Sequence, residues 1–191
     1  MQAWRIDVLA KADQLDPVGD AAKRALTAAG LSGITGVRAR RGYLLGAELT
    51  AAQVETFARE VLCDPVVEQF VVHAPGARPA PPADAHAVTI VPRPGVTDPV
   101  AHSVQKALAD MHLPMVAAGT YRCFDVRGLD RSDVVKSQLL QAAKKGLAND
   151  TVQELLFDAI PDGLPGEPPP PGLAVQSVAL AVDDEAALVA L

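Results

Sequence analysis

Few side chains in this chain have the type and spacing that enzyme chemistry requires. Cys63 and Cys123 form no C-x-x-C pair, and neither lies in the G-x-[SC]-x-G turn that exposes a catalytic nucleophile. The glycine-rich stretch 30–36 follows an expected helix instead of opening one, which is typical of a helix end and turn and not of a phosphate-binding loop. We therefore predict no catalytic residue, and we expect both cysteines to be small core residues.

The histidines point to no metal site. None of them is spaced i, i+4 from another, and the chain contains no H-E-x-x-H motif. We expect all four on the solvated surface: His73, His86, His102 and His112.

The one basic cluster offers a binding hypothesis. It combines Lys23 and Arg24 with Arg38, Arg40 and Arg41. Arginine pairs well with phosphate and carboxylate groups, so the cluster is suited to a phosphate or an acidic partner surface. The alternative, which we favour, is a solvated turn and helix face.

The composition excludes several classes of protein. The 191 residues include 17 Lys and Arg against 23 Asp and Glu, and a net charge of −6 gives no broad basic field for nucleic acid. The N-terminus carries charges where a signal peptide needs an apolar core, and no stretch approaches the ~18 apolar residues of a membrane span. We expect a globular cytoplasmic protein that binds neither nucleic acid nor a membrane.

An internal repeat organises most of the chain. Residues 16–26 align with residues 98–108 at a shift of 82, and five of the eleven positions are identical. Residues 62–67 align with residues 147–152 at a shift of 85, so three residues have been inserted in between. Two copies of one unit therefore account for most of the sequence.

The repeat and the proline-rich stretches define four parts of the chain. We call the two copies module 1 (1–74) and module 2 (86–160). Residues 75–85 have the composition of a stiff linker, and residues 161–191 combine a second proline-rich stretch with an expected short strand and helix.

Each module is expected to begin with a strand and a capped helix. Residues 4–8 alternate between apolar and charged, the period-2 pattern of a strand buried on one face. Asp16 is a good N-cap, and Pro17 suits the first helical position because its missing N–H needs no partner there. Asp98 and Pro99 repeat the same helix start in module 2.

The rest of each module predicts a two-layer α+β sandwich. One strand or a strand pair is expected next, then a helix that opens with a capping box at residues 50–53, or near Ser132 in module 2. Strands at 66–72 and 152–157 close the modules. The result is a β-α-β-β-α-β type of fold with helices on one face of a largely antiparallel sheet, and we expect the two modules to pair about a pseudo-twofold axis.

These patterns together resemble the PurS family, the small subunit of phosphoribosylformylglycinamidine synthase. Residues 88–99 run from a strand through a Pro-Gly turn into the Asp-Pro helix start and are similar to the opening of PurS. Module 1 carries the same pattern at residues 6–8 and 15–19, and residues 61–68 are similar to the family's leucine, asparagine, proline, valine, isoleucine, glutamate stretch. The resemblance implies structural or interface roles for the matching residues Asp16, Pro17, Arg38, Arg40, Arg93, Pro94, Gly95, Asp98 and Pro99.

The resemblance implies a non-catalytic scaffold in a glutamine amidotransferase complex of de novo purine synthesis. In that complex a PurQ-like glutaminase releases ammonia, and a PurL-like synthetase uses ATP and Mg²⁺ to convert formylglycinamide ribonucleotide (FGAR) to formylglycinamidine ribonucleotide (FGAM). The PurS part bridges the two subunits and needs no cofactor of its own.

The chain also departs from the usual family pattern. A PurS protein is commonly one module that dimerises, whereas this chain carries two modules like an internal dimer. Residues 119–124 replace the basic stretch 38–42, so a contact made there is expected to be one-sided. Residues 182–191 resemble the segment that leads into the synthetase, which suggests the N-terminal part of a fused PurS-PurL chain. Further self-association is left open.

Two other functions fit parts of the pattern. One is a tandem regulatory domain of ferredoxin-like type that binds a small metabolite between its modules, near residues 30–36. The other is a small enzyme that uses Arg38, Arg40 and His102.

Overall fold

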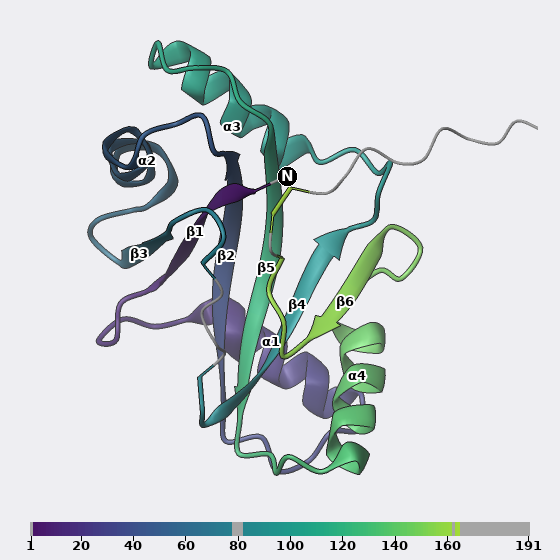
Figure 1. Ribbon diagram of the computed structural model, residues 1–191. Coiled ribbons are helices and arrows are strands. Elements are labelled where there is room, and N and C mark those ends of the chain that lie inside the picture. Colours follow the sequence, from purple (N-terminus) through teal and green to yellow (C-terminus); the bar gives the residue numbers. More distant parts are fainter. Residues whose placement is uncertain (1, 78–81, 162, 165–191) are drawn as a thin grey trace, which may run out of the picture.

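The computed structural model describes residues 2–77, 82–161 and 163–164 (Figure 1). The elements of module 1 are β1 (Ala3–Ala10), α1 (Pro17–Ala28), β2 (Gly36–Gly46), α2 (Ala51–Phe57), the π-helical turn η1 (Ala58–Leu62) and β3 (Glu68–His73). Those of module 2 are β4 (Ala85–Pro92), α3 (Pro99–Asp110), β5 (Ala118–Arg127), α4 (Asp133–Gly146) and β6 (Gln153–Phe157).

The strands of both modules form one antiparallel sheet. Its six strands lie in the order β3-β1-β2-β5-β4-β6, and every neighbouring pair is antiparallel. β2 and β5 join the modules over ten consecutive residue pairs, from Gly36↔Arg127 to Leu45↔Ala118. The strand order reads the same from either edge when the modules are exchanged, which confirms the predicted pseudo-twofold pairing.

The axis of this pseudo-symmetry passes through the centre of the β2–β5 pair. Ala39 and Thr120 hold equivalent positions, because each donates its backbone N–H to the N-cap aspartate of its own module. The same spacing of 81 residues relates Arg41 to Arg122, and these two are direct cross-strand partners. The two arginines therefore face each other at the axis.

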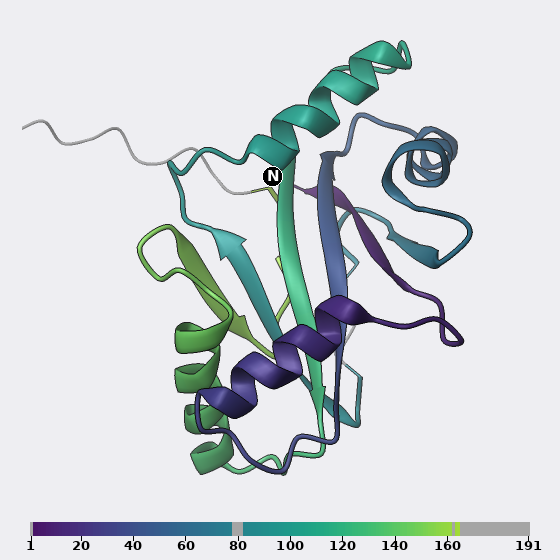
Figure 2. The ribbon, with the colours of Figure 1, turned by 180° about the vertical axis from the view of Figure 1, so that it is seen from behind.

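The predicted α+β class is confirmed, with the helices on one face of the sheet (Figure 2). Between the two helices of each module the structure has one long strand and not a strand pair: β2 spans 11 residues and β5 spans 10. No turn interrupts β2, because the glycine at its middle, Gly42, lies under the ring of Tyr121 on β5 and stays in the ladder.

Each module's first helix shares a hydrophobic core with the other module's second helix. In one core cluster Leu26 and Leu31, from α1 and the residues after it, contact Leu139 and Ala143 of α4. In the other, Val104 and Leu108 of α3 join the core that contains Val54 and Phe57 of α2. Figure 2 shows α1 lying across the strands toward α4. Both cores are therefore built from residues of both modules.

The expected helix starts are confirmed in detail. Asp16 and Asp98 are N-caps followed by proline, Thr50 and Gln53 form a complete capping box, and Ser132 caps α4. β3 begins at Glu68 and not at residue 66, because Asp64 accepts hydrogen bonds from the backbone of Val66 and Glu68 and holds a turn there.

Two other sequence-based expectations concern the tail and the membrane. The strand and helix expected beyond residue 172 lie outside the described residues. Within the described part of the chain, none of the helices combines the length and the hydropathy needed to cross a bilayer.

The close approach of Tyr121 to Gly42 predicts a specific loss of stability. A Cβ added at Gly42 would collide with the Tyr121 ring, whereas a Cβ at Gly36, on the same strand, would meet nothing within 4 Å. We expect Gly42→Ala to lower the free energy of unfolding by about 1–3 kcal/mol, the usual cost of overpacking. Gly36→Ala is the matched control and should stay within about 0.5 kcal/mol of wild type. Urea titrations of both variants test this, and equal stability would contradict the packing described.

Candidate functional site

A buried polar network crosses the junction between the modules on the sheet face opposite the helices. The Tyr121 hydroxyl donates to Asp7 Oδ1 at 2.5 Å, and Arg40 Nη2 donates to Asp125 Oδ1 at 2.6 Å. Arg40 Nη1 also lies 3.6 Å from Asp7 Oδ2. Asp7 and Asp125 are only 2% and 4% exposed, so these contacts are shielded from water. Each module thus supplies one carboxylate and one partner for the other module's carboxylate.

Arg5 and His73 complete the network around Asp7. Arg5 Nε lies 3.5 Å and His73 Nε2 lies 3.3 Å from Asp7 Oδ2. Burial, together with the positive charge of Arg5, lowers the pKa of His73. His73 is therefore a neutral ring at pH 7, and the charges nearest Asp7 are those of the two arginines.

The protonation states of the network are fixed by burial and by its charges. Burial and the nearby Asp7 carboxylate raise the pKa of Tyr121, so its hydroxyl keeps its proton and donates. Burial would lower the pKa of Arg40, but Cys123, Asp125 and Asp7 together raise it. Burial raises the pKa of Cys123 to about 11, which leaves an unreactive thiol at pH 7. The expectation that Cys123 is a core residue is confirmed.

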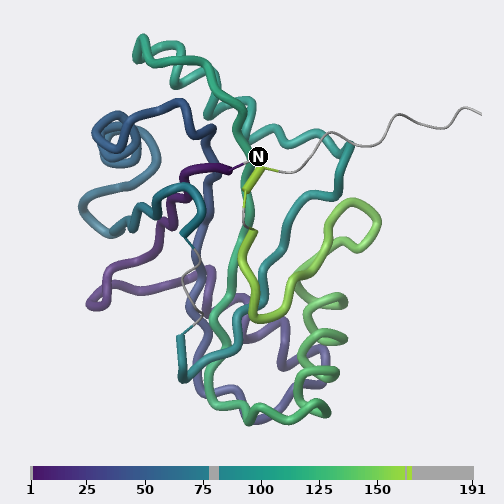
Figure 3. Tube along the Cα trace, viewed as in Figure 1, coloured from purple at the N-terminus to yellow at the C-terminus, as the bar shows by residue number. Residues whose placement is uncertain are grey.

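The network is not repeated by the pseudo-symmetry. The positions of module 2 equivalent to Arg5 and Asp7 hold Ala87 and Thr89. The Thr89 hydroxyl donates to Ala159 O at 2.7 Å, in the segment that crosses this face after β6 (Figures 1 and 3). Module 2 therefore uses this position to hold the segment that follows its last strand and not to bind a charge.

The favoured prediction for the basic cluster, a solvated turn and helix face, is wrong for residues 38–41, whereas Lys23 and Arg24 do lie on the helix α1, where Arg24 is exposed. Residues 38–41 lie in the middle of β2, where alternate side chains point to opposite faces. Arg38 donates to Ala10 O and Arg40 belongs to the buried network, while Arg41 lies on the helix side. The partners of Arg40 are 33 and 85 residues away in sequence, so local pattern carried no signal of them.

His86 also differs from its expected surface position. Its side chain is 4% exposed, with Nδ1 3.1 Å from Asp158 Oδ2 and Nε2 2.9 Å from Asp130 O. These partners hold the loop after β5 and the end of β6 against β4. The surface prediction is also wrong for His73, whose side chain is only 20% exposed and contacts Asp7. His102 and His112 are exposed, as expected. Among the residues that the structure describes, no three His, Cys, Asp or Glu side chains are placed to hold a metal ion.

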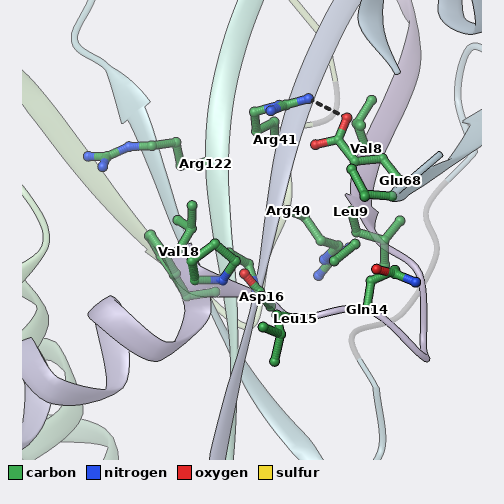
Figure 4. Close-up of a pocket in the computed structure, with 15 residues that line it drawn as sticks. Val8, Leu9, Gln14, Leu15, Asp16, Val18, Arg40, Arg41, Glu68 and Arg122 are labelled. Carbon is green, nitrogen blue, oxygen red and sulfur yellow. Dashed lines mark hydrogen bonds and ion pairs between the residues drawn. The ribbon is translucent and has the colours of Figure 1, made fainter. Parts of the chain in front are cut away.

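The residues matched to the family motif gather around two open grooves. The first groove, about 660 Å³, lies on the helix face between the start of α1 and β3 (Figure 4). Its lining includes Asp16, Pro17 and the strand at Arg40, with Arg41 and Arg122 on its floor.

The second groove, about 830 Å³, lies at the corresponding turn of module 2. Arg93, Pro94, Gly95 and Asp98 line it, together with His102 of α3. Of the nine motif residues, Arg38 and Pro99 line neither groove. The structure thus brings the other seven to the corresponding strand-to-helix turns of the two modules, although the second groove also reaches Leu44 on the face opposite the helices.

Asp16 and Asp98 fix the shape of the two grooves. Asp16 accepts from Gly19 N with Oδ1 and from Ala39 N with Oδ2, both at 2.7 Å. Asp98 likewise accepts from Ala101 N at 3.0 Å and from Thr120 N at 2.9 Å. Each carboxylate ties the first turn of a helix to the middle of the neighbouring strand. The bond to the strand is additional to the helix cap. The sequence motif predicted the cap but not this bond, because the donor lies on a different element.

The fold is thus a duplicated α+β unit whose halves share one sheet, with a groove at each strand-to-helix turn. A family model described as "PurS: Phosphoribosylformylglycinamidine (FGAM) synthase" matches residues 3–75 and 85–160. The chain therefore belongs to the PurS family and carries the family's module twice, as the resemblance had indicated. Membership connects it with FGAM synthase, with the other subunits of that enzyme, and with purine biosynthesis. No curated protein sequence shows significant similarity to the chain.

The double role of Asp16 predicts an effect larger than that of an ordinary surface aspartate. Asp16→Ala removes the acceptor of two backbone N–H groups, one of them on β2. We expect the free energy of unfolding to fall by about 1–3 kcal/mol. Asp13→Ala, an exposed aspartate in the preceding turn, is the control and should change it by less than about 0.5 kcal/mol. A small effect at both sites, measured by chemical denaturation, would rule out the bridging role.

The lowered pKa of His73 predicts a pH-dependent stability. In the unfolded chain His73 binds a proton near its ordinary pKa of 6.5, whereas the folded protein resists that proton. The His73 contribution is therefore complete above pH 6.5 and is lost as the pH falls through the lowered folded pKa. We expect His73→Gln to flatten the decline in stability between about pH 7.5 and 5. His102→Gln leaves His73 in place and should keep the wild-type decline; the same slope in all three proteins would contradict the assignment.

Proposed function

We propose that this chain is the scaffold component of FGAM synthase, which holds a PurL-type synthetase and a PurQ-type glutaminase together. The observation that carries the proposal is the family match over both modules, which spans nearly all the residues described. The chain is a non-catalytic part of the enzyme in this proposal, and its role is to support complex formation and ammonia transfer.

The chemistry belongs to the partner subunits. The glutaminase hydrolyses glutamine and releases ammonia, while the synthetase uses ATP and Mg²⁺ to phosphorylate the amide oxygen of FGAR. Ammonia then displaces the phosphate, and the oxygen leaves with it, to give FGAM. Because the two reactions occur on different subunits, a component that fixes their relative position lowers the loss of ammonia to solvent.

Two features of the fold support a bridging role. The ten-residue β2–β5 pairing makes both modules parts of one sheet, so contacts made through one module are held in register with contacts made through the other. The two grooves lie at equivalent turns on different modules, which allows one chain to contact two subunits at once.

No observation on the described residues specifically supports either alternative function. The ligand of a metabolite-binding domain was expected near residues 30–36, and this stretch lines neither groove. The residues of the hypothetical small enzyme lie apart: Arg40 is paired with Asp125, Arg38 donates to Ala10 O, and His102 lines the second groove.

Reconstitution tests the scaffold proposal. We expect glutamine-dependent FGAM formation by the host's synthetase and glutaminase to require this chain, with a complex of all components on size-exclusion chromatography. Ammonium chloride supplied in place of glutamine is the control, since free ammonia bypasses the need to hold the subunits together. Full glutamine-dependent activity without the chain, and no association with either subunit, would overturn the proposal.

A further inference from the structure

Two like charges occupy the centre of the sheet on its helix face. Arg41 and Arg122 are direct cross-strand partners at the pseudo-twofold axis, and both are exposed on the floor of the first groove. Like charges directly opposite each other in an antiparallel pair are destabilising. Such a pair is favourable only where negative charge or carbonyl oxygen surrounds it.

Both arginines make the same contact with the backbone of their own module. Arg41 Nη2 donates to Leu62 O at 3.3 Å, and Arg122 Nη2 donates to Leu147 O at 3.0 Å. These carbonyls end the second helical segment of each module, where a cation is favourable. In this respect the two sites are equivalent.

The two sites differ in the negative charge beside them. Arg41 Nη2 donates to Glu68 Oε2 at 2.8 Å, and Figure 4 shows Arg41 turned toward Glu68 while Arg122 extends the other way. Module 2 has Gln153 where module 1 has Glu68, and each accepts the same kind of backbone N–H, from Asn149 or from Asp64. Within the described residues, Arg122 pairs with no carboxylate.

The surroundings of Arg122 favour an anion with an apolar neighbour. Partial burial of its side chain lowers the pKa of Arg122, so the cation has lost part of its hydration without being neutralised. The same groove carries three apolar side chains at its rim, Leu15, Val18 and Val67, which are 87%, 57% and 40% exposed. A small anion such as phosphate would neutralise Arg122 but leave these side chains in water, whereas a protein segment would cover both.

We propose that the first groove docks a segment of a partner subunit that carries a carboxylate flanked by apolar side chains, with Arg122 pairing with that carboxylate. The proposal rests on the scaffold function proposed above. Arg122 occupies the position equivalent to Arg41, and the partner's carboxylate supplies the negative charge that Glu68 supplies to Arg41. Arg41 is already paired with Glu68, whereas the equivalent residue beside Arg122 is the uncharged Gln153. Only Arg122 therefore remains to bind the partner's carboxylate.

A single amide-to-acid change tests this docking site. Gln153→Glu would give Arg122 an internal carboxylate like the one that Glu68 provides to Arg41, which should satisfy the cation and exclude the partner's carboxylate. We expect the Kd of the full chain for its partner subunit to rise about tenfold or more in Gln153→Glu and in Arg122→Glu, which repels the carboxylate. Gln141→Glu, the same chemical change at an exposed position of α4 outside both grooves, is the control and should leave the Kd within about twofold.

The readouts separate docking from a structural role. In Gln153→Glu the melting temperature should equal or exceed that of wild type while binding weakens, and the salt dependence of binding should fall. If wild type binds its partners and Gln153→Glu binds as tightly, the docking site is wrong and the scaffold function stands. If wild type binds neither subunit, both proposals fail. If inorganic phosphate raises the melting temperature of wild type but not of Arg122→Gln, the occupant is a small anion, and the assignment of a protein segment is overturned.

Discussion

The antiparallel pairing of β2 with β5 is the interaction on which the rest of this structure depends. It places Arg41 opposite Arg122 and thereby fixes the pseudo-twofold axis. A shift of one residue would turn every side chain of one strand to the other face of the sheet. Tyr121 could then no longer lie over Gly42 or reach Asp7, and Arg40 would lose Asp125. The buried network therefore stabilises this register, and the register in turn positions the residues of the network.

The helices make each module depend on the other, because neither module closes a hydrophobic core with its own helices alone. α1 packs on α4 and α3 packs beside α2, so removal of one module would expose the apolar face of the other. This exchange also explains why the grooves sit where they do. The first helix of each module, α1 or α3, starts beside its own module's strands and runs toward the other module, so the turns at Asp16 and Asp98 stay uncovered. The turn at Asp16 is open on the helix face, whereas the groove at Asp98 also reaches Leu44 on the opposite face.

The sequence predicted those features whose causes lie within a few residues of one another. Caps at Asp16, Thr50, Asp98 and Ser132 were visible because a cap joins neighbours, and the repeat showed that the fold was double. The errors have one physical cause. Arg40 and His86 were predicted to lie on the surface. Their partners lie 85 and 72 residues away, on other strands and loops, so no local pattern indicated them. The family motif predicted which residues form the candidate site. It did not predict that Arg40 faces the buried network and Arg41 the helix side, because this depends on the alternation of side chains along β2.

The tandem arrangement permits contacts that two identical chains could not make. Arg40 and Tyr121 hold equivalent positions, so in a homodimer both would have to be arginine or both tyrosine. The junction also lies within one molecule, where a tether of about a dozen residues gives an effective concentration in the millimolar range or above. If the two modules were separate chains, their concentration would have to exceed the dissociation constant before the six-stranded sheet could form. Here the sheet forms by a first-order reaction, so dilution in a cell that makes few copies cannot take it apart.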